Sequence, residues 1–367
     1  MIWRVLVLVS ALFTVAGGLC IAEPGIEGRN LLSLENGVAS VIVDFGGGAI
    51  VDFHLKGHDL NPLNWNYPEK GDLNPRLMGH FICFDRWGQP SRSEGENGMP
   101  FHGEATNVNW DIPAAPEHKA GGIVAEMSCV LPIGRLSMHR TLKLDDTNAV
   151  LTVKEEIKNV GKLGRVYNIV QHSTYAPPFL DESVLADTNV KKGFTQLGRM
   201  PTPEEPVVYW PKTVFEGRLF DFRRLIDDIG PGVVSYVFDD DVRYGWATAC
   251  NPPKGLLIGY IWDTAEYPWL NFWYQVEDGK PAARGIEFGT TGLHQPFKIL
   301  LKKNMIFGRP LYEYIDAEES IVKSYTMFLA LIPTDYRGVA DIGFGDGVIT
   351  LKEHGGDTSR DIVVSLR

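Results

Sequence analysis

The sequence predicts an all-β protein built as one large antiparallel sandwich. Apolar and polar residues alternate with a period of two along many short segments. No segment of about 20 residues has the 3.6-residue period of an amphipathic helix, and no strand–helix alternation runs along the chain, so a parallel sheet is not expected. Glycine, proline, asparagine and aspartate recur between the alternating segments, as they do in tight turns.

Individual strands can be placed from the same alternation. Residues 39–45 and 49–55 read as two strands around the glycines at 46–48. The segment "RLSMHRTLKLDDTNAVLTVKEEIKNVG" reads as a strand, a turn at 145–148 and a second strand that ends at Asn159. Four more strands are expected in "GLLIGYIW", "LNFWYQV", "RGIEFGT" and "SYTMFLALIP".

Three parts of the chain are expected. Residues 1–22 have one arginine, an apolar run from 5 to about 19, and the small-residue pattern "CIA", which predicts a secretory signal peptide cleaved near Ala22. A lipoprotein site at Cys20 is disfavoured because the preceding Leu19 is bulky. Residues 23–335 form the sandwich, and residues 336–367 form a C-terminal hairpin around "HGGDTSRD". We therefore expect a secreted or periplasmic protein.

Composition limits the classes of molecule that the protein is expected to bind. The 367 residues carry a formal charge of −11, which argues against nucleic acid or an anionic membrane surface, and the apolar run is short for a membrane span. Cleavage would leave Cys83, Cys129 and Cys250, without CxxC or Cys/His metal spacing. Cys129 alternates like a strand residue and is expected to be buried. We expect no cofactor and no metal; the oligomeric state stays open.

Four segments gather polar groups among aromatics and glycines. They are "GHFICFDRWGQP" with Arg86, "GMPFHGEATNVNW" with His102 and Glu104, "QHSTYAPPF" with His172, and "RGIEFGTTGLH" with Glu287. Each also has a purely structural reading: a surface ion pair, a turn, a buried histidine or a solvent-facing carboxylate. Glu287 lies between Ile286 and Phe288 in a strand, so it points either to solvent or into a concave face where an ionisable group is costly unless used.

The order of these segments resembles the galactose mutarotase-like superfamily, which contains the aldose 1-epimerases. The segments "GGGAIVDFHLKG", "RTLKLDDTNAVLTVKEEIKNVG" and "GIEFGTTGL" are similar to the family's opening strand pair, central hairpin and late glutamate strand. The resemblance covers most of the mature chain. It implies a large antiparallel β-supersandwich whose cleft binds a sugar.

The resemblance also implies roles for single residues. Glu287 matches the family's general base, His172 its general acid and His102 the histidine that binds substrate hydroxyls, whereas Arg86 is a candidate for the cleft arginine. Asp263 in "YIWDTAEYPW" is the candidate for the family's substrate-binding aspartate. Five tryptophans offer a stacking face for the sugar ring: Trp87, Trp110, Trp262, Trp269 and Trp273. The chain departs from the family pattern where Glu104 follows Gly103 and where Gln171 precedes His172.

These residue types fit anomer exchange. The proton of the anomeric hydroxyl leaves while the ring oxygen gains one, the ring opens, and it closes on the other face. A carboxylate and an imidazolium on opposite sides of the sugar do this without a cofactor, so we expect His172 and Glu287 to face each other across a sugar-sized gap; each positioned proton transfer contributes about 10²–10⁴ in rate. This chemistry predicts an ionised Glu287 and a protonated His172 at working pH.

Other function classes remain open from the sequence. The chain could bind carbohydrate without turning it over. A glycosidase would need a second carboxylate, and Glu104 is the candidate partner of Glu287. A polysaccharide lyase would use His172 and Tyr175 with Arg86, although the acidic balance disfavours a polyanionic substrate.

Overall fold

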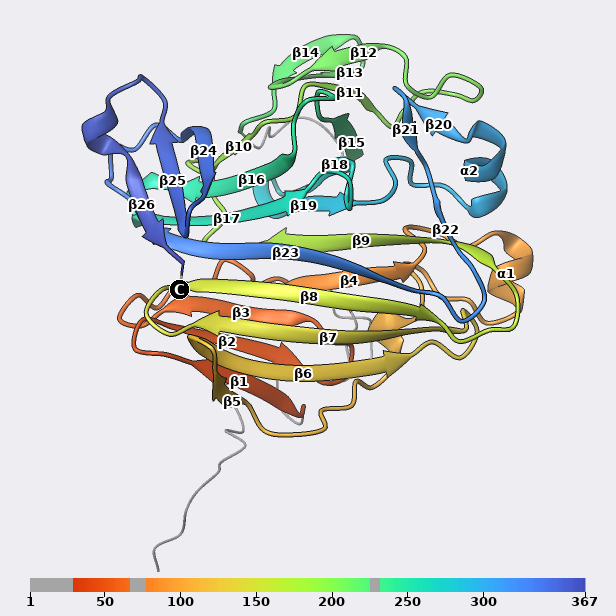
Figure 1. Ribbon diagram of the computed structural model, residues 1–367. Helices are drawn as coiled ribbons and strands as arrows, with labels where there is room; N and C mark the ends of the chain where they lie inside the picture. Colours follow the sequence, from red (N-terminus) through yellow and green to blue (C-terminus); the bar gives the residue numbers. More distant parts are fainter. Residues whose placement is uncertain (1–28, 67–76, 225–231, 367) are drawn as a thin grey trace, which may run out of the picture.

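The computed structural model describes residues 29–66, 77–224 and 232–366. Two large sheets lie face to face and a small sheet covers part of one of them (Figure 1). Every strand pair in these sheets is antiparallel, so the predicted all-β sandwich is confirmed. The expected signal peptide, with Cys20, lies outside the described residues.

The first sheet has 11 strands. One of them, β22, lies off the main strand order and pairs with the first residues of β9. Ten of the strands follow one another across the sheet. In this order they are β1 (Leu31–Glu35), β2 (Ala39–Asp44), β3 (Ile50–Leu55), β4 (His80–Asp85), β9 (Arg165–Tyr175), β19 (Lys280–Gly289), β18 (Trp269–Glu277), β15 (Gly232–Val237), β11 (Lys192–Thr195) and β12 (Val207–Tyr209); β22 is Glu313–Ile315.

The second sheet has eight strands and contains the predicted central hairpin. Its order is β10 (Leu185–Thr188), β16 (Tyr244–Asn251), β17 (Leu256–Asp263), β23 (Ser320–Leu331), β8 (Val150–Asn159), β7 (Leu136–Asp145), β6 (Gly122–Val130) and β5 (Glu117–Lys119). In β8, buried and exposed side chains alternate along nearly the whole strand. This is the period of a strand with one face on a core and the other in solvent.

Short elements complete the part of the chain that the structure describes. They are two hairpins, β13 (Lys212–Phe215) with β14 (Arg218–Asp221) and β20 (Met305–Ile306) with β21 (Arg309–Pro310), two helices, α1 (Arg92–Glu96) and α2 (Phe297–Lys303), and three 3₁₀ turns, η1 (Ala105–Asn107), η2 (Pro252–Lys254) and η3 (Thr358–Arg360). A capping box closes the start of α1, because the Ser91 side chain accepts from the Glu94 amide and the Glu94 side chain accepts from the Ser91 amide. No helix in the described ranges is long and apolar enough to cross a membrane.

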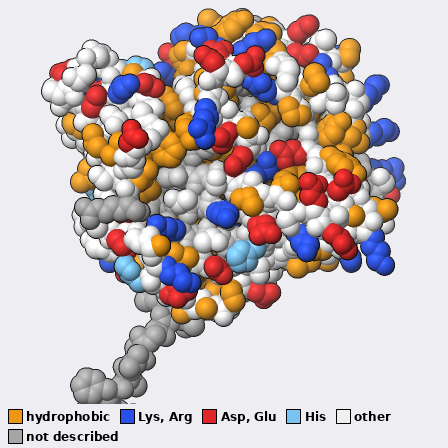
Figure 2. All heavy atoms as spheres, in the orientation of Figure 1, with side chains coloured by type: hydrophobic (Ala, Val, Ile, Leu, Met, Phe, Trp, Pro, Cys, Tyr) orange, Lys and Arg blue, Asp and Glu red, His pale blue; other side chains and the backbone are white. Residues whose placement is uncertain are grey.

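The main core fills the space between the two large sheets. It is made of apolar side chains that point inward from both, such as Phe84 and Phe288 from the first sheet and Leu142 and Met327 from the second. Cys129 lies in this core, 4% exposed, as its alternation predicted. On the surface, acidic and basic side chains are interspersed with apolar ones over the face that Figure 2 shows.

The middle strands of the 11-stranded sheet are buried on both faces. In β9, every residue from Tyr167 to Tyr175 is buried. Ile286 and Phe288 of β19 belong to the core between the sheets, so Glu287 between them points to the opposite face of the sheet. Parts of the chain outside the second sheet therefore bury the outer face of these middle strands. Two of the polar residues singled out from the sequence, Glu287 and the residue paired with it on β9, lie on this outer face.

The C-terminal segment is a three-stranded sheet rather than a hairpin. Its strands are β24 (Val339–Gly345), β25 (Val348–Glu353) and β26 (Ile362–Ser365). Strands β25 and β26 flank "HGGDTSRD" as predicted. The additional strand arises because Asp346 and Gly347, both with positive φ, turn the chain inside the segment that was expected to form a single strand before "HGGDTSRD".

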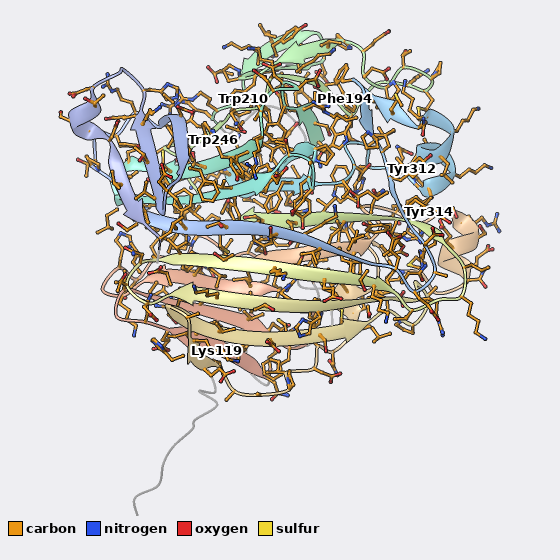
Figure 3. The ribbon with its side chains drawn as sticks, in the orientation of Figure 1. Lys119, Phe194, Trp210, Trp246, Tyr312 and Tyr314 are labelled. Atoms are coloured by element: carbon orange, nitrogen blue, oxygen red, sulfur yellow. The ribbon has the colours of Figure 1, made fainter. Side chains whose placement is uncertain are left out.

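This small sheet packs on the outer face of the eight-stranded sheet. Apolar residues of the small sheet, such as Ile349 and Leu351, share a cluster with Trp246, Leu257 and Phe328 of the larger one (Figure 3 labels Trp246). The C-terminal sheet thus covers a surface far in the fold from the outer face of the 11-stranded sheet, and it contributes no residue to the pocket described next.

Candidate functional site

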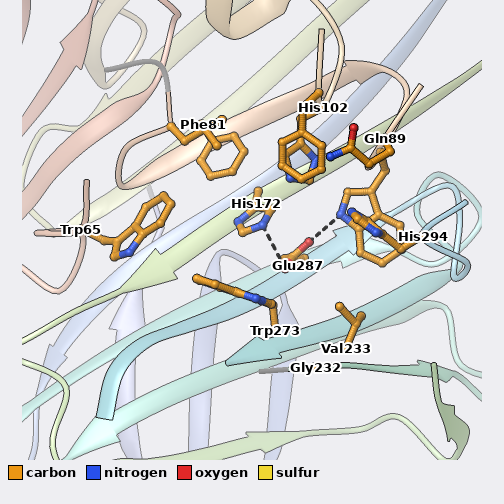
Figure 4. A pocket seen from close by; sticks show the side chains of 13 residues that line it. Trp65, Phe81, Gln89, His102, His172, Gly232, Val233, Trp273, Glu287 and His294 are labelled. Carbon is orange, nitrogen blue, oxygen red and sulfur yellow. Dashed lines mark hydrogen bonds and ion pairs between the residues drawn. The ribbon is translucent and has the colours of Figure 1, made fainter. Parts of the chain in front are cut away.

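A pocket of about 580 Å³ opens on the outer face of the 11-stranded sheet. Its floor is made of side chains that neighbouring strands place side by side. Phe81 of β4 pairs in register with His172 of β9, and His172 pairs with Glu287 of β19. On the next two strands, Trp273 of β18 pairs with Val233 of β15. Because these positions share one face of the pleat, all five side chains line the pocket (Figure 4).

The centre of the pocket is a contact between an imidazole and a carboxyl group. His172 Nε2 lies 3.1 Å from Glu287 Oε1, and the two side chains are 6% and 1% exposed. The two groups are in direct contact, so they do not face each other across a sugar-sized gap as the sequence predicted. Apart from this contact, Glu287 Oε1 has no hydrogen-bond partner within the described residues, although it is fully buried. Buried polar atoms are nearly always satisfied, so this oxygen is a candidate acceptor or donor for a ligand.

Two features hold the Glu287 carboxyl in place. The indole Nε1–H of Trp87 donates to Oε2 at 2.9 Å. Gly285, two residues earlier on the same face of β19, leaves the room that the carboxyl occupies: a Cβ at this position would lie 2.8 Å from Glu287 Oε1 and 3.3 Å from His172 Cε1. The sequence motif "RGIEFG" therefore supplies the glycine as well as the acid.

The imidazole of His172 is held from its other side. Its Nδ1 lies 2.8 Å from Thr174 Oγ1, and its ring stacks on Phe81 with centroids 4.2 Å apart. Thr174 follows two residues after His172 and so lies on the same face of β9. This partner orients the ring so that Nε2 is the nitrogen presented to Glu287 and to the pocket.

Burial moves the protonation of the pair toward its neutral form. Burial lowers the pKa of His172 well below its usual value, with a smaller effect of nearby His294 in the same direction. Burial raises the pKa of Glu287 well above its usual value, opposed by the hydrogen bond from Trp87. Burial therefore favours one proton on the carboxyl group and a neutral imidazole, in contrast to the ionised pair expected from the sequence.

His102 forms part of the pocket wall. It sits in a turn with a φ of 64°, next to Gly103. Its Nδ1 accepts from the Gly88 amide at 3.2 Å and lies 3.1 Å from Cys83 Sγ. Since Nδ1 is engaged in these contacts, Nε2 is the nitrogen free to meet a ligand.

Solved structures show the same architecture. No family model matches the chain, and no curated protein matches it in sequence. A galactose mutarotase-like protein from Clostridium acetobutylicum superposes with a TM-score of 0.60 at 13% identity, covering 84% of this chain and 98% of that one. The fold is the galactose mutarotase-like β-sandwich.

Two further structures with the galactose mutarotase-like fold agree. A candidate aldose 1-epimerase from Klebsiella pneumoniae superposes with a TM-score of 0.60 at 16% identity, over 84% of this chain and 81% of that one. A galactose mutarotase-related enzyme from Lactobacillus acidophilus gives 0.57 at 13% identity, over 82% and 97%. At these identities the comparison establishes the fold alone, so activity has to be argued from the pocket.

Of the residues that the sequence singled out within this mutarotase-like fold, five meet in the pocket. Trp87, His102, His172, Trp273 and Glu287 all line it. The convergence of His172, Glu287 and Trp273 follows from the strand order, because β9, β19 and β18 are consecutive neighbours although β9 is distant from the other two along the chain.

Arg86 does not line the pocket. Its guanidinium lies 3.0 Å from Asp85 Oδ2 and 2.6 Å from Glu94 Oε1, and it packs over the ring of Phe297. Two carboxylates thus neutralise the charge within its own loop and the following helix. In the "DRWG" segment it is the neighbouring Trp87 that reaches the pocket.

Asp263 also lies elsewhere. It ends β17 in the eight-stranded sheet, where its Oδ2 is 3.6 Å from Arg243 Nε, and it is not among the residues lining the pocket. Of the five tryptophans offered as stacking faces, Trp87 and Trp273 line the pocket. The other three, Trp110, Trp262 and Trp269, are at most 2% exposed and pack in apolar clusters.

His294 is the main residue that the sequence reading missed. It lines the pocket, and its ring lies 4.8 Å from Trp87 and 5.6 Å from His102, measured between centroids. Gly88 makes room for it, because a Cβ there would lie 2.6 Å from its Nε2. Its position at the end of the segment that carries Glu287, "RGIEFGTTGLH", is the sequence feature that could have found it, although no periodic pattern marks it.

Proposed function

We propose that this chain is an aldose 1-epimerase-like enzyme that interconverts the anomers of a sugar, with His172 and Glu287 as its acid–base pair. The observation that carries the proposal is the 3.1 Å contact between Nε2 and Oε1, buried at the centre of a pocket in a mutarotase-like fold. The two oxygens that exchange protons during anomer exchange are bonded to the same carbon. A base and an acid that touch each other can therefore reach both of them.

The proposed reaction moves two protons and no other atoms. Glu287 takes the proton of the anomeric hydroxyl while His172 Nε2 gives one to the ring oxygen; the bond between that oxygen and the anomeric carbon breaks and a carbonyl forms. After rotation about the next carbon–carbon bond, the ring closes on the other face and both protons return. The Trp87 indole steadies the charge on the carboxylate, and Thr174 keeps Nε2 available.

This mechanism uses the charged form of the pair, which burial disfavours. The pair shares one transferable proton in either form, and moving it from Glu287 Oε1 to His172 Nε2 changes no total charge. Sugar hydroxyls that bond to Glu287 Oε1, which contacts His172 but has no other hydrogen-bond partner in the described residues, would favour the carboxylate. Substrate binding therefore prepares the base and the acid together.

Two alternative activities lose support from the geometry. Glu104 accepts hydrogen bonds from the amides of Ile133 and Gly134, at 3.0 and 2.6 Å, and does not line the pocket, so a carboxylate pair with Glu287 is not formed. Tyr175 points into the core between the sheets, opposite to His172, and Arg86 is outside the pocket. The three groups that a lyase would combine are thus separated.

Carbohydrate binding without turnover is the second candidate. The observation in its favour is the neutral state that burial gives the His172–Glu287 pair. A screen of free aldoses for accelerated mutarotation, by polarimetry or anomer-resolved NMR, separates the two functions. The epimerase requires acceleration of at least one aldose that binds; binding of several aldoses with no acceleration of any would establish the binding module instead.

Glu104→Gln is the matched control in this screen. It changes a buried carboxylate outside the pocket and is expected to leave the rate per folded molecule unchanged. Loss of the activity in folded Glu104→Gln protein would bring the hydrolase-type carboxylate pair back into consideration.

The proposal includes export. It rests on the charged, apolar and small-residue order of the first 22 residues. Mass spectrometry of the native protein is expected to find a mature chain that begins near Glu23. An intact Met1 terminus, or a lipid on Cys20, would contradict export by this signal.

A further inference from the structure

The turn that carries His102 is held against the end of β4 by its backbone. Gly103 makes a bridge with Phe84, and a Cβ at Gly103 would lie 2.1 Å from the carbonyl oxygen of Phe84. The backbone amide of His102 donates to the carbonyl oxygen of Gly88 at 3.0 Å. The position of the His102 ring is therefore set by contacts of the backbone around it.

Two groups approach the same nitrogen of this ring. The Gly88 amide donates to His102 Nδ1 at 3.2 Å, and Cys83 Sγ lies 3.1 Å from the same atom. A backbone amide can only donate a hydrogen bond, so Nδ1 presents its lone pair and carries no proton. The thiol must then be a donor as well, because a nitrogen without a proton has nothing to donate to the sulfur.

Cys83 is suited to be that donor. Its side chain leaves β4 on the same face as Phe81, and it is fully buried in the apolar cluster that also contains Trp87. Burial raises the pKa of the Cys83 thiol well above its usual value. The S–H group is therefore retained at neutral pH and can be shared with His102.

These contacts decide which tautomer His102 adopts. A neutral imidazole carries its proton on one nitrogen, and the hydrogen bond made by the other nitrogen selects which one. Because Nδ1 accepts, the proton lies on Nε2, the nitrogen presented to a ligand in the pocket that His102 lines. Burial lowers the pKa of His102 well below its usual value, so the ring stays neutral at neutral pH. A second proton at Nδ1 would also face two donors.

The neighbouring imidazole of His172 is held differently. Its Nδ1 lies 2.8 Å from the hydroxyl of Thr174, which can either donate or accept a hydrogen bond. The hydroxyl therefore accommodates His172 with a proton on Nδ1, on Nε2 or on both. The rings of His102 and His172 lie 5.6 Å apart between centroids. One pocket thus contains a histidine whose proton can move and a histidine whose proton is fixed.

We infer that Cys83 is a positioning residue of this pocket: its thiol and the Gly88 amide fix His102 as the tautomer with a proton on Nε2, so that His102 donates a hydrogen bond to an oxygen of the bound sugar and takes no part in proton exchange. The part of the inference that concerns a sugar rests on the proposed function. The tautomer and the hydrogen bond of the thiol do not, because they are properties of the folded chain.

Nitrogen NMR of the imidazole rings tests the tautomer directly. Spectra of the isotope-labelled wild-type protein at neutral pH distinguish a protonated ring nitrogen from one that accepts a hydrogen bond, and His102→Gln identifies the His102 signals by their loss. We expect a protonated Nε2 and an unprotonated Nδ1. A proton on Nδ1 of His102 would overturn the inference, and this measurement needs neither a sugar nor a folded Cys83 variant.

Infrared spectroscopy tests the donor role of the thiol. The difference between wild-type and Cys83→Ala spectra isolates the S–H stretch of Cys83, and the difference between His102→Leu and the double variant isolates the same band without its acceptor. A donating S–H absorbs at lower frequency than one without an acceptor, so the band is expected to move to higher frequency when the imidazole is removed. An unchanged band would overturn the role of the thiol.

Kinetics separate positioning from packing. A hydrogen bond that His102 makes equally in the ground and transition states changes KM and not kcat. We expect Cys83→Ala to raise KM for galactose or glucose roughly 3–10-fold, the size expected of one hydrogen bond, with kcat unchanged. Cys83→Ser keeps a donor and should retain the KM of the wild type. Cys129→Ala, which removes a thiol from the core between the sheets, is the control and should change neither constant. Equal rises in KM in Cys83→Ala and Cys83→Ser would show that packing of the sulfur matters and would overturn the role of its hydrogen bond.

Failure of the proposed function is recognised separately. If neither sugar is interconverted faster, the epimerase is contradicted for these sugars, whereas the NMR and infrared spectra still decide the tautomer and the role of the thiol. A proton on Nδ1 of His102 in a protein with rapid turnover would contradict the inference and leave the epimerase standing.

Discussion

His172 and Glu287 face each other from paired positions on the neighbouring antiparallel strands β9 and β19, with 3.1 Å between Nε2 and Oε1. Strand pairing fixes this relationship, since the two Cα atoms are register partners and both side chains leave the same face of the sheet. The pair is thus part of the sheet itself and not of a mobile loop. Changes to the few neighbours that touch it should alter activity more than stability.

Gly285 is the first neighbour of the His172–Glu287 pair, because its lack of a side chain leaves room for the carboxyl group. Gly285→Ala places a Cβ 2.8 Å from Glu287 Oε1, so the carboxyl must shift and the activity is expected to fall at least ~10-fold. Gly37→Ala is the control, because no atom lies within 4 Å of a Cβ at that exposed position. Mutarotation assays on both variants check this; normal activity in folded Gly285→Ala would show that the carboxyl position is not critical.

The hydroxyl of Thr174 is the second neighbour of the His172–Glu287 pair. Thr174→Val keeps the shape but removes the partner 2.8 Å from His172 Nδ1, and Thr174→Ser keeps the hydroxyl. We expect kcat to fall about 10–100-fold in the valine variant, because an unfixed ring loses positioning of its reacting nitrogen, and to stay near normal in the serine variant. Equal losses in both would mean that packing of the methyl group, and not the hydrogen bond, matters.

Much of this site could be predicted from sequence, for a physical reason. Alternation showed that Glu287 points away from the core side of Ile286 and Phe288 but left solvent and a concave face open, and the resemblance to the mutarotase-like family selected the cleft. His172 and His102 were found from polar residues next to strand ends and glycines. Alternation likewise predicted the strands that place them.

Strand register and ion pairing could not be predicted from the alternation of apolar and polar residues. Whether Arg86 reaches the pocket depends on Glu94, which a short helix brings to it, and on Asp85, whose positive φ turns the chain there. Asp263 belongs to the other sheet, and sheet membership depends on long-range pairing. His294 was missed because a lone histidine after a turn carries no periodic signal.

Stability should depend on pH through the buried imidazoles. Burial lowers the pKa of His80 to about 3 and of His294 to about 4, and also lowers those of His102 and His172. Below about pH 6.5 the unfolded chain binds protons that the folded chain excludes, so the folded state loses stability as pH falls toward 4. Glu287 acts in the opposite sense, because its raised pKa makes the folded state lose stability as pH rises above about 4.5.

Urea unfolding between pH 7 and pH 4.5 (roughly the window set by the pKa values of histidine and glutamate in the unfolded chain) measures the sum of these opposing effects on stability. Four imidazoles oppose two carboxyl groups whose pKa burial raises, Glu287 and Glu266, so the midpoint is expected to fall with decreasing pH, and less steeply in His294→Asn than in the wild type. A midpoint that stays constant across this range would contradict the neutral, buried state of these side chains.

The central claim is that His172 and Glu287 act together in the transition state, and steady-state mutarotation of Glu287→Gln tests it most directly. The amide keeps the shape and can still bind sugar but cannot exchange the proton, so kcat is expected to fall at least ~10² with little change in sugar affinity. His172→Asn should behave similarly. Wild-type kcat in folded Glu287→Gln would contradict the account.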